Sequence, residues 1–289
     1  MIKNNIKKLK NTILVCILFF LNSCKNITLM NPQGLIGLEE KKLILIAIFL
    51  MLGIVLPVII MTIVFVFKYR ESNTRSIYLP NWQHSKKIEY IIWGVPIFAI
   101  IFLATITWNS THSLDPKKEI QSLNSTLNIQ VISLDWKWLF IYPDYNIATV
   151  NEIAFPKNVP IKFNITSSSV MNSFFIPQLG GQIYAMAGMN SILHLVSNET
   201  GKYKGISANF SGPGFSEMKF IAISLSDKNE FDTWIKNIQK SSKKLENMQE
   251  YQILAHPSIN HPIEHFSRVK PNLFDDVVNQ FKHSHNIYN

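Results

Sequence analysis

Cysteine is scarce in this chain. Only Cys16 and Cys24 occur among its 289 residues, and both lie close to the N-terminus. A metal centre held by thiolates needs cysteine sulfur at fixed spacing, and a disulfide needs two cysteines. The sequence after Cys24 supplies neither, so thiolate metal sites and disulfide scaffolds are excluded there.

Acidic residues are also few, and the basic residues are not gathered into a stripe. Lys and Arg number 28 against 19 for Asp and Glu, which gives a formal charge of +9. The chain is rich in Ile, Asn and Lys, whose codons are AT-rich, so we interpret much of the charge as background. No basic stripe interleaved with aromatic residues occurs, and nucleic acid is therefore not expected as a partner.

The N-terminus has the pattern of an export signal. Four lysines between residues 3 and 10 precede the apolar run 13–21, which is shorter than the roughly 20 residues that span a bilayer. The run ends in LNSC, 21–24, which resembles a bacterial lipoprotein signal. We predict a signal peptide over 1–23 and a lipid, such as palmitate, on Cys24. An ordinary signal with an incidental cysteine is the alternative.

Two long apolar runs follow a short exported segment, 24–42. Leu43–Phe67 and Ile88–Trp108 are long enough to span a membrane, and Glu89 is the one charged residue within them. The alternative is a pair of core helices in a soluble protein, but the runs are too uniformly apolar for that. They offer no relay of intramembrane carboxylates.

The loop between the two runs sets their orientation. Residues 68–87 contain five basic residues against Glu71. Positive charge stays on the cytoplasmic side, so the loop is predicted to be cytoplasmic and both outer ends to face the periplasm. This agrees with an exported N-terminus. The location predicted is a bacterial inner membrane, with a periplasmic domain at the C-terminal side.

Residues 109–226 have the pattern of an all-β domain. Short alternating stretches are separated by turn-rich segments such as YPDYN and SGPG. The predicted strands are Leu127–Leu134, Trp136–Tyr142, Pro160–Thr166, Ser191–Ser197 and Met218–Ser224. The spacing predicts a β-sandwich or barrel with a single core.

Residues 227–289 form a predicted helical arm. Asp227 and Glu230 resemble a capping box, and Phe231, Trp234, Ile235 and Ile238 fall on one helix face. A charged, irregular stretch follows. A second amphipathic helix is predicted from Phe274, Val277, Val278 and Phe281. The arm would lie on the domain or on a partner.

The segment Tyr203–Met218 resembles a cupredoxin metal loop without its ligands. Soft sulfur and imidazole donors are what copper requires, but the segment offers Ser207, Ser211 and Phe215, with Met218 as the remaining soft donor. We interpret Met218 as a core methionine.

The order of the segments carries a wider resemblance. A lipobox and an apolar hairpin precede the aromatic strand Asp135–Pro143, VMNSFFIPQLG at 170–180 and the loop Tyr203–Met218. Matching phrases are VNEIAFP, QIYAMAGM, SGPGFS and VKPNLF. From about residue 34 to 281 the chain resembles subunit II of the haem–copper terminal oxidases, and more narrowly the cytochrome bo-type ubiquinol oxidase branch. The resemblance implies a cupredoxin-like Greek-key sandwich behind a transmembrane hairpin.

The resemblance also implies which positions have lost copper ligands. In the cytochrome c oxidase branch a binuclear copper centre uses two histidines, two cysteines, a glutamate carbonyl and a methionine. The resemblance places the histidines at Asn172 and Phe215 and the cysteines at Ser207 and Ser211. The glutamate falls on Asn209 and the methionine on Met218. Only the methionine is retained, so no metal or other cofactor is expected in this chain. Asn209 also makes the family's magnesium site doubtful.

Two further residues match family positions. Trp136 matches the aromatic residue that receives electrons from cytochrome c, but without copper that role has no destination. The alternative is that Trp136, Trp138, Phe140 and Tyr142 pack their strand against subunit I. Glu89 matches a carboxylate near the mouth of a proton channel. The alternative for Glu89 is an acid favoured by the helix dipole.

The resemblance implies a non-redox subunit of a proton-pumping ubiquinol oxidase. Haems and copper are expected in the partner subunit I, and subunits III and IV, ubiquinol and membrane lipid are the other expected partners. One alternative is a free-standing periplasmic electron-transfer or copper-delivery lipoprotein. Another is an adaptor lipoprotein unrelated to respiration. The histidines 256, 261, 265, 283 and 285 are irregularly spaced and do not predict a metal site.

Overall fold

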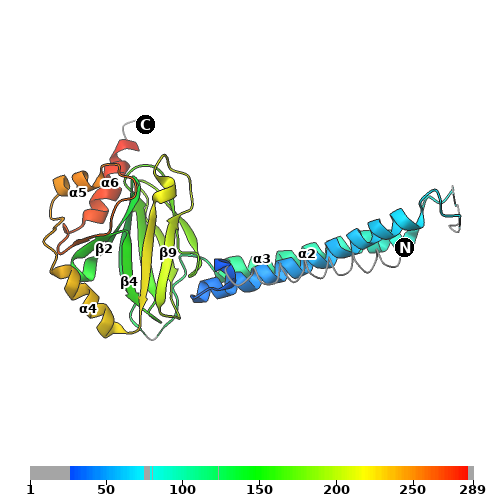
Figure 1. The fold of residues 1–289 in the computed structure, drawn as a ribbon, viewed down its shortest axis with the longest axis horizontal. Coiled ribbons are helices and arrows are strands. Elements are labelled where there is room, and N and C mark those ends of the chain that lie inside the picture. The colour runs from blue at the N-terminus through cyan, green and yellow to red at the C-terminus, as the bar shows by residue number, and fades with distance from the viewer. Residues whose placement is uncertain (1–26, 75–78, 80, 123, 286–289) are drawn as a thin grey trace, which may run out of the picture. The chain divides into compact units, whose positions relative to one another are not determined.

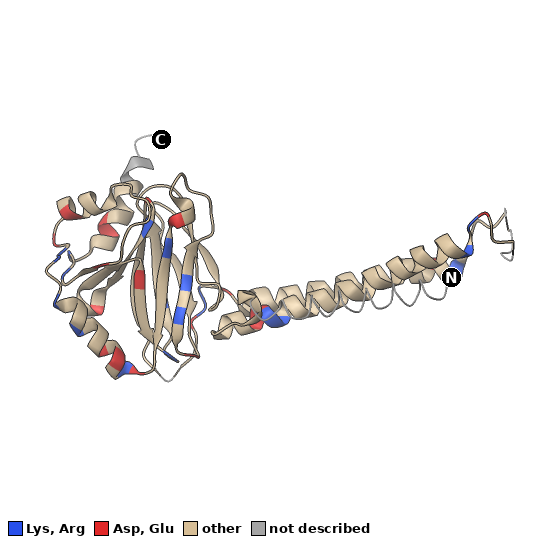
Figure 2. Cartoon of the chain, in the orientation of Figure 1, with Lys and Arg blue, Asp and Glu red and all other residues tan. Residues whose placement is uncertain are grey.

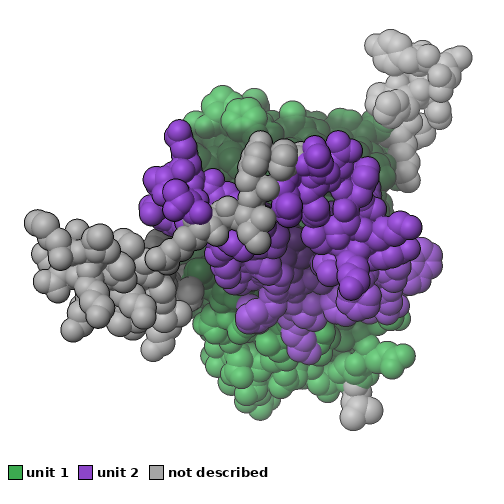
Figure 3. Space-filling view, turned by 90° about the vertical axis from the view of Figure 1, so that its right-hand side faces the viewer, with its two compact units in different colours: residues 1–41, 116–289 green, residues 42–115 purple. Residues whose placement is uncertain are grey.

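The chain is organised in two compact units. A computed structural model describes residues 27–74, 79, 81–122 and 124–285, so Cys24 and the predicted signal peptide lie outside the described residues. One unit contains residues up to 41 together with 116–289, and the other contains residues 42–115 (Figure 3). Each unit is considered by itself below.

The unit 42–115 is dominated by two long helices. Helix α2 runs over Leu35–Lys68 and helix α3 over Lys86–Ser113, and both are long and apolar enough to cross a membrane. Charged residues are confined to the ends of the two helices (Figure 2). Large apolar side chains are exposed along both helices, for example Phe49 and Phe98 at 70% and 72%. Such a surface is unfavourable in water and favourable in lipid.

Both helices extend beyond the predicted apolar runs. The predicted spans 43–67 and 88–108 fall inside α2 and α3, which continue through polar turns at their ends. Pro57 and Pro96 lie within the two helices without ending them. Which turns lie inside a bilayer remains a prediction from hydropathy.

The other unit is built on two β-sheets (Figure 1). The six-stranded sheet has the order β11-β3-β2-β1-β5-β8, and the five-stranded sheet has the order β4-β10-β9-β6-β7. Neighbouring strands are antiparallel except for β1 with β5 and β4 with β10, which are parallel. The strands are β1 Leu127–Leu134, β2 Lys137–Tyr142, β3 Ile147–Val150, β4 Glu152–Pro156, β5 Ile161–Ser167, β6 Asn172–Phe175, β7 Gln182–Ala185, β8 Ser191–Leu195, β9 Gly201–Ser207, β10 Lys219–Leu225 and β11 Glu264–Phe266.

A first apolar core joins the two sheets. The rings of Phe174 and Phe220 stack with centroids 5.1 Å apart, and Trp138 meets Phe174 edge-on at 5.3 Å. The sequence-based alternative that strand Trp136–Tyr142 packs against a partner subunit is wrong for three of its four aromatic residues. Trp138, Phe140 and Tyr142 are fully buried in this chain's own sandwich. Their burial stabilises the fold by roughly 2 kcal/mol each.

The C-terminal arm packs on the domain itself. The arm contains helices α4 Lys228–Gln239, α5 Met248–Ala255 and α6 Leu273–His285, and strand β11 lies between α5 and α6 in the chain. The predicted cap is confirmed, because the Asp227 side chain accepts a hydrogen bond from the Glu230 amide at 2.8 Å. The stretch between the two predicted helices is not irregular as expected, since it contains α5 and β11. Both elements are too short to give a clear hydrophobic periodicity in the sequence.

A second core lies between the arm and the outer face of the six-stranded sheet. Leu273, Phe274, Val277 and Val278 of α6 are buried there, together with Tyr251 of α5. The sheet contributes Ile132, Leu134, Leu139, Ile141, Ala148 and Val150. The six-stranded sheet is therefore covered on both faces.

The first turns of α2 are fixed to the sandwich by hydrogen bonds from both backbone and side chain. The Gly37 amide donates to the Leu179 carbonyl at 3.0 Å, and the Gly181 amide donates to Glu40 Oε1 at 3.1 Å. Gly180 has a φ of +86°, and a Cβ at this position would lie 2.6 Å from the Gly37 nitrogen. Glycine is thus required here by both conformation and space.

Candidate functional site

The loop between β9 and β10 occupies the place of the predicted metal loop. It contains the short 3-10 helix η4, Phe215–Glu217, and its base is closed by a hydrogen bond from the Ser207 amide to the Met218 carbonyl at 3.2 Å. Strand β6 lies beside β9 and brings Asn172 to the same end of the sheet. The structure therefore gathers Asn172, Ser207 and Met218 at one point.

Asn172 and Ser207 bind each other. The Ser207 hydroxyl donates a hydrogen bond of 3.0 Å to Asn172 Oδ1, and both side chains are buried. The Asn172 amide donates to the Val170 carbonyl at 3.4 Å. Met218 is buried in the first core. A buried polar pair that satisfies itself in this way is stable without any ligand.

The remaining three predicted positions lie in the same loop and differ in their contacts. The Asn209 amide donates to the Met171 carbonyl at 3.2 Å, across to the end of β6. Phe215 packs its ring edge-on against Phe210 at 5.8 Å. Ser211 Oγ is buried and has no hydrogen-bond partner among the described residues. The Asn209 carbonyl also accepts a hydrogen bond of 3.4 Å from Ser207 Oγ, so Asn209 adjoins the pair of Asn172 and Ser207.

The Trp136 side chain packs against the loop and is hydrogen-bonded to it. Its indole nitrogen donates to the Ser211 carbonyl at 3.2 Å, and its ring lies against two glycines of the loop. A Cβ on Gly212 or Gly214 would lie 2.8 or 2.6 Å from this ring. Sequence reasoning missed this contact, although the GPG segment indicates a close approach by another group.

The donor set does not fit a binuclear copper centre. Two copper ions in mixed valence need bridging thiolates and imidazoles, which are soft and carry accessible lone pairs. Here the loop offers hydroxyls, amides and one thioether, and a phenyl ring replaces one imidazole position. Serine hydroxyls are hard donors that stay protonated at neutral pH. We therefore derive no electron-transfer step through this loop.

Glu89 lies in the first turn of α3. Its side chain is half exposed, and His84 Nδ1 lies 3.7 Å from Glu89 Oε1. An acid in this position is favoured by the helix dipole whatever its function. Its proposed part in proton uptake remains a prediction, as does lipid attachment at Cys24.

The histidines of the arm pair with separate carboxylates. His265 Nε2 lies 3.1 Å from Glu152 Oε1, and His261 Nε2 lies 3.2 Å from Glu264 Oε1. The hydrogen bond from His265 lowers the pKa of Glu152 below its ordinary value. No group of three metal-binding side chains occurs among the described residues. The side chains of residues 282–285 are outside the described part of the chain.

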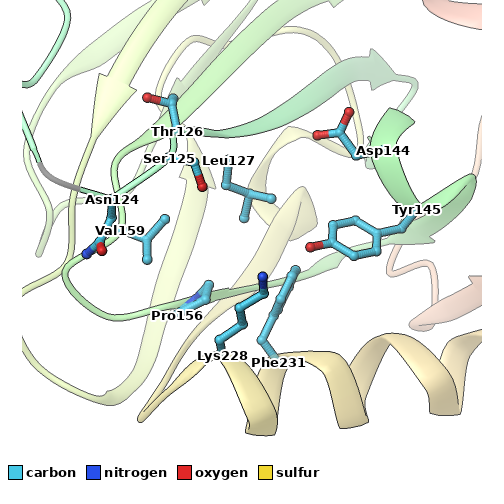
Figure 4. Close-up of a pocket in the computed structure, with 10 residues that line it drawn as sticks. All are labelled: Asn124, Ser125, Thr126, Leu127, Asp144, Tyr145, Pro156, Val159, Lys228 and Phe231. Carbon is cyan, nitrogen blue, oxygen red and sulfur yellow. The ribbon is translucent and has the colours of Figure 1, made fainter.

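A separate cavity of about 350 Å³ lies beside the N-terminal end of α4 (Figure 4). Lys228 and Phe231 of α4 line it, with Tyr145 from the short 3-10 helix η3, Pro143–Tyr145. Burial raises the pKa of the Tyr145 hydroxyl above its ordinary value. The cavity shares no residue with the loop at 207–218, and its volume is at the lower end for small-molecule sites.

Fold and loop together define the class. The family described as Cytochrome C oxidase subunit II, periplasmic domain, matches residues 146–225, and the COX Aromatic Rich Motif matches residues 239–285. A solved periplasmic domain of subunit II of cytochrome oxidase from Bradyrhizobium japonicum is 23% identical, with a TM-score of 0.37. It covers 38% of this chain and 91% of that chain. The family match over residues 146–225 identifies the β-sandwich as a periplasmic domain of the oxidase subunit II type.

Two relatives show to which branch of the oxidase subunits the chain is similar in sequence. The chain is 55% identical over 271 residues to the cytochrome bo(3) ubiquinol oxidase subunit 2 of Buchnera aphidicola subsp. Schizaphis graminum, covering 94% of this chain and 93% of that one. The corresponding protein of Pseudomonas putida is 52% identical over 265 residues, covering 92% and 83%. This chain belongs to the subunit 2 family of the cytochrome bo(3) ubiquinol oxidases. It is a membrane-anchored subunit of that respiratory-chain complex, and the resemblance inferred from sequence is confirmed.

Proposed function

We propose that this chain is a non-redox subunit that anchors and caps the oxidase without holding a copper centre. The observation that carries the proposal is the buried pair of Asn172 and Ser207, which uses its own polar atoms where a histidine and a cysteine would bind copper. Phe215 removes a further donor position. The Phe215 ring packs against Phe210 instead.

The absence of a thiolate copper site is consistent with ubiquinol as the electron donor of the complex. A water-soluble donor protein needs an acceptor exposed on the extramembrane domain, whereas ubiquinol is lipid-soluble and delivers electrons within the membrane. We propose that electrons pass directly from ubiquinol to haems and copper in subunit I. In this scheme, subunits I, III and IV are the partners of this chain.

The placement in the membrane is part of the proposal. The basic loop 68–87 is assigned to the cytoplasm, and the sandwich with its arm to the periplasm of a bacterial inner membrane. Lipid attachment at Cys24 would add a second anchor to the two helices. One acyl chain alone binds a membrane only marginally, so the helices would supply most of the anchoring.

The deciding experiment is gentle purification through an affinity tag on this chain. We expect haem absorbance, quinol-dependent oxygen uptake and no electron paramagnetic resonance signal of a mixed-valence copper pair. An untagged strain taken through the same steps controls for adventitious haem. A colourless, inactive preparation of this chain alone would contradict the proposal. Copper bound to the isolated chain would instead favour a free-standing electron-transfer or copper-delivery protein.

A further inference from the structure

A row of polar side chains joins strand β2 to the arm. Lys137 Nζ donates to Ser258 Oγ at 2.6 Å, and Ser258 Oγ lies 3.0 Å from His261 Nδ1. On the other side of the ring, His261 Nε2 lies 3.2 Å from Glu264 Oε1. The oxidase subunit assignment uses none of these residues.

Lys137 is an unusual residue for the inside of a domain. It is 1% exposed, and its ammonium group donates to the His256 carbonyl at 2.7 Å as well as to Ser258. Lysine is almost never fully buried without a partner. Burial lowers the pKa of Lys137, against the opposing charges of Asp135 and Glu264.

The hydrogen bonds have a definite direction. An ammonium group can only donate, so Ser258 Oγ accepts from Lys137 and keeps its own proton free to be donated to His261 Nδ1. With Nδ1 accepting, the ring proton lies on Nε2, the nitrogen that is 3.2 Å from Glu264 Oε1. A neutral His261 completes this arrangement beside the buried ammonium group.

The same row lies where the backbone of the arm is hydrogen-bonded to the sandwich. The Ser258 amide donates to the Asp135 carbonyl at 2.8 Å, and the Trp136 amide donates to the Ser258 carbonyl at 3.4 Å. The Asn151 amide donates to the His261 carbonyl at 2.8 Å. Strand β11 follows directly and pairs with β3. The segment 256–266 is thus attached to the sandwich at several points around one imidazole.

Protonation of His261 would disturb the row at its centre. A second ring proton on Nδ1 would compete with the Ser258 proton, and a new positive charge would share that hydroxyl with Lys137. Lys243 adds a further cation near Glu264, at 3.1 Å, while His265 and Glu152 pair with each other nearby. Among the described residues, Glu264 is the carboxylate that favours the imidazolium. Burial and Lys137 outweigh it, so the pKa of His261 is lowered.

We propose that His261 is a proton-sensitive latch that holds segment 256–266 on the sandwich when neutral and releases it on acidification. The pH range in which the latch opens follows from the linkage between proton binding and closure. A group whose pKa is lowered by folding binds more protons in the open form, so closure is favoured above its ordinary value of 6.5. Closure weakens as the pH falls below that value. An oxidase that exports protons would expose this latch to the compartment that it acidifies.

The test is hydrogen exchange by mass spectrometry on the purified oxidase, between about pH 5.5 and about pH 7.5. Amide protection of the segment 256–266, corrected for the intrinsic pH dependence, should fall at the acidic end. The fall should approach about tenfold for each unit by which folding lowers the His261 pKa. Constant protection over this range would overturn the proposal.

Two variants separate the latch from general acid sensitivity. His261→Asn keeps an accepting oxygen near the Nδ1 position but does not titrate, so its protection should not change with pH. His256→Asn is the matched control, because the His256 side chain is exposed and only its carbonyl is used; it should behave as the wild type. An unchanged step in His261→Asn would overturn the proposal.

A direct titration does not depend on any variant. Exchange of the histidine C2 proton, followed in the wild-type oxidase, reports the pKa of each ring. We expect the His261 pKa to lie below its ordinary value of 6.5. A His261 pKa at or above 6.5 would overturn the proposal, even if His261→Asn failed to assemble.

Discussion

Phe220 and Gly205 face each other across strands β10 and β9 so closely that no side chain fits between them. A Cβ on Gly205 would lie 2.0 Å from Phe220 Cζ. The Phe220 ring in turn stacks on Phe174 in the first core. The position of the Phe220 ring over strand β9, and hence its stacking in the first core, therefore depends on a glycine at residue 205.

The first prediction concerns this contact. Gly205→Ala should destabilise the domain by about 1–3 kcal/mol, because overpacking a dense core forces backbone or side-chain shifts. The loss should appear as a lower thermal midpoint of the purified oxidase. Lys204→Ala, on the exposed face of the same strand, is the control and should change little. If Phe220→Leu does not recover part of the loss in the double variant, the steric explanation fails.

The second prediction restores the copper ligands. The strands and the loop base are in place, so placing histidines, cysteines and glutamate at the five changed positions should allow a binuclear copper centre to form. Those positions are Asn172, Phe215, Ser207, Ser211 and Asn209. Purple absorbance and a mixed-valence resonance signal after adding copper would be the readout. The same variant with both serines retained should bind no such centre, since the bridging thiolates are missing.

The third prediction is a pH dependence at Glu152. The hydrogen bond from His265 lowers the Glu152 pKa below 4.5, so its stabilisation is fully present above pH 4.5 and is lost as the pH falls through the folded value. Glu152→Gln should lower stability by about 1 kcal/mol at neutral pH. The difference from wild type should close in acid. Glu217→Gln, at an exposed ion pair with Lys219, should show a smaller effect.

The fourth prediction concerns Glu89. Glu89→Gln keeps the shape of the side chain at the start of α3 but removes its charge, so proton uptake during turnover should slow while haem content stays unchanged. Stopped-flow proton uptake in reconstituted vesicles is the measurement. His84→Gln tests whether the neighbouring imidazole, 3.7 Å away, contributes. Equal turnover and equal uptake in Glu89→Gln would leave Glu89 as a helix-end acid only.

Sequence reasoning located the long elements well and the short ones poorly. Apolar runs predicted both long helices, but hydropathy could not show that α2 begins at Leu35, because its first turns contain Glu39 and Lys41. Strand β1 was placed at its observed bounds. Strand β6 and strand β11 were not, since four or fewer residues give too little alternation to stand out.

The site was predicted in its chemistry but not in its contacts. The loss of copper donors is visible in residue types alone, because serine and phenylalanine cannot replace cysteine and histidine. The hydrogen bond from Ser207 to Asn172 joins residues far apart in the chain and needs the pairing of β6 with β9. The contact of Trp136 with Gly214 likewise depends on how the strands meet.

Strand β2 has no face toward water, and this limits how the protein can be divided. All six of its residues are buried, with Trp138 and Phe140 on one side and Leu139 and Ile141 on the other. A fragment cut after the sandwich would present the second row to solvent as a flat apolar sheet, which invites aggregation. The smallest autonomous piece of the extramembrane part is therefore three layers thick, and the arm is a structural layer of it rather than an appendage.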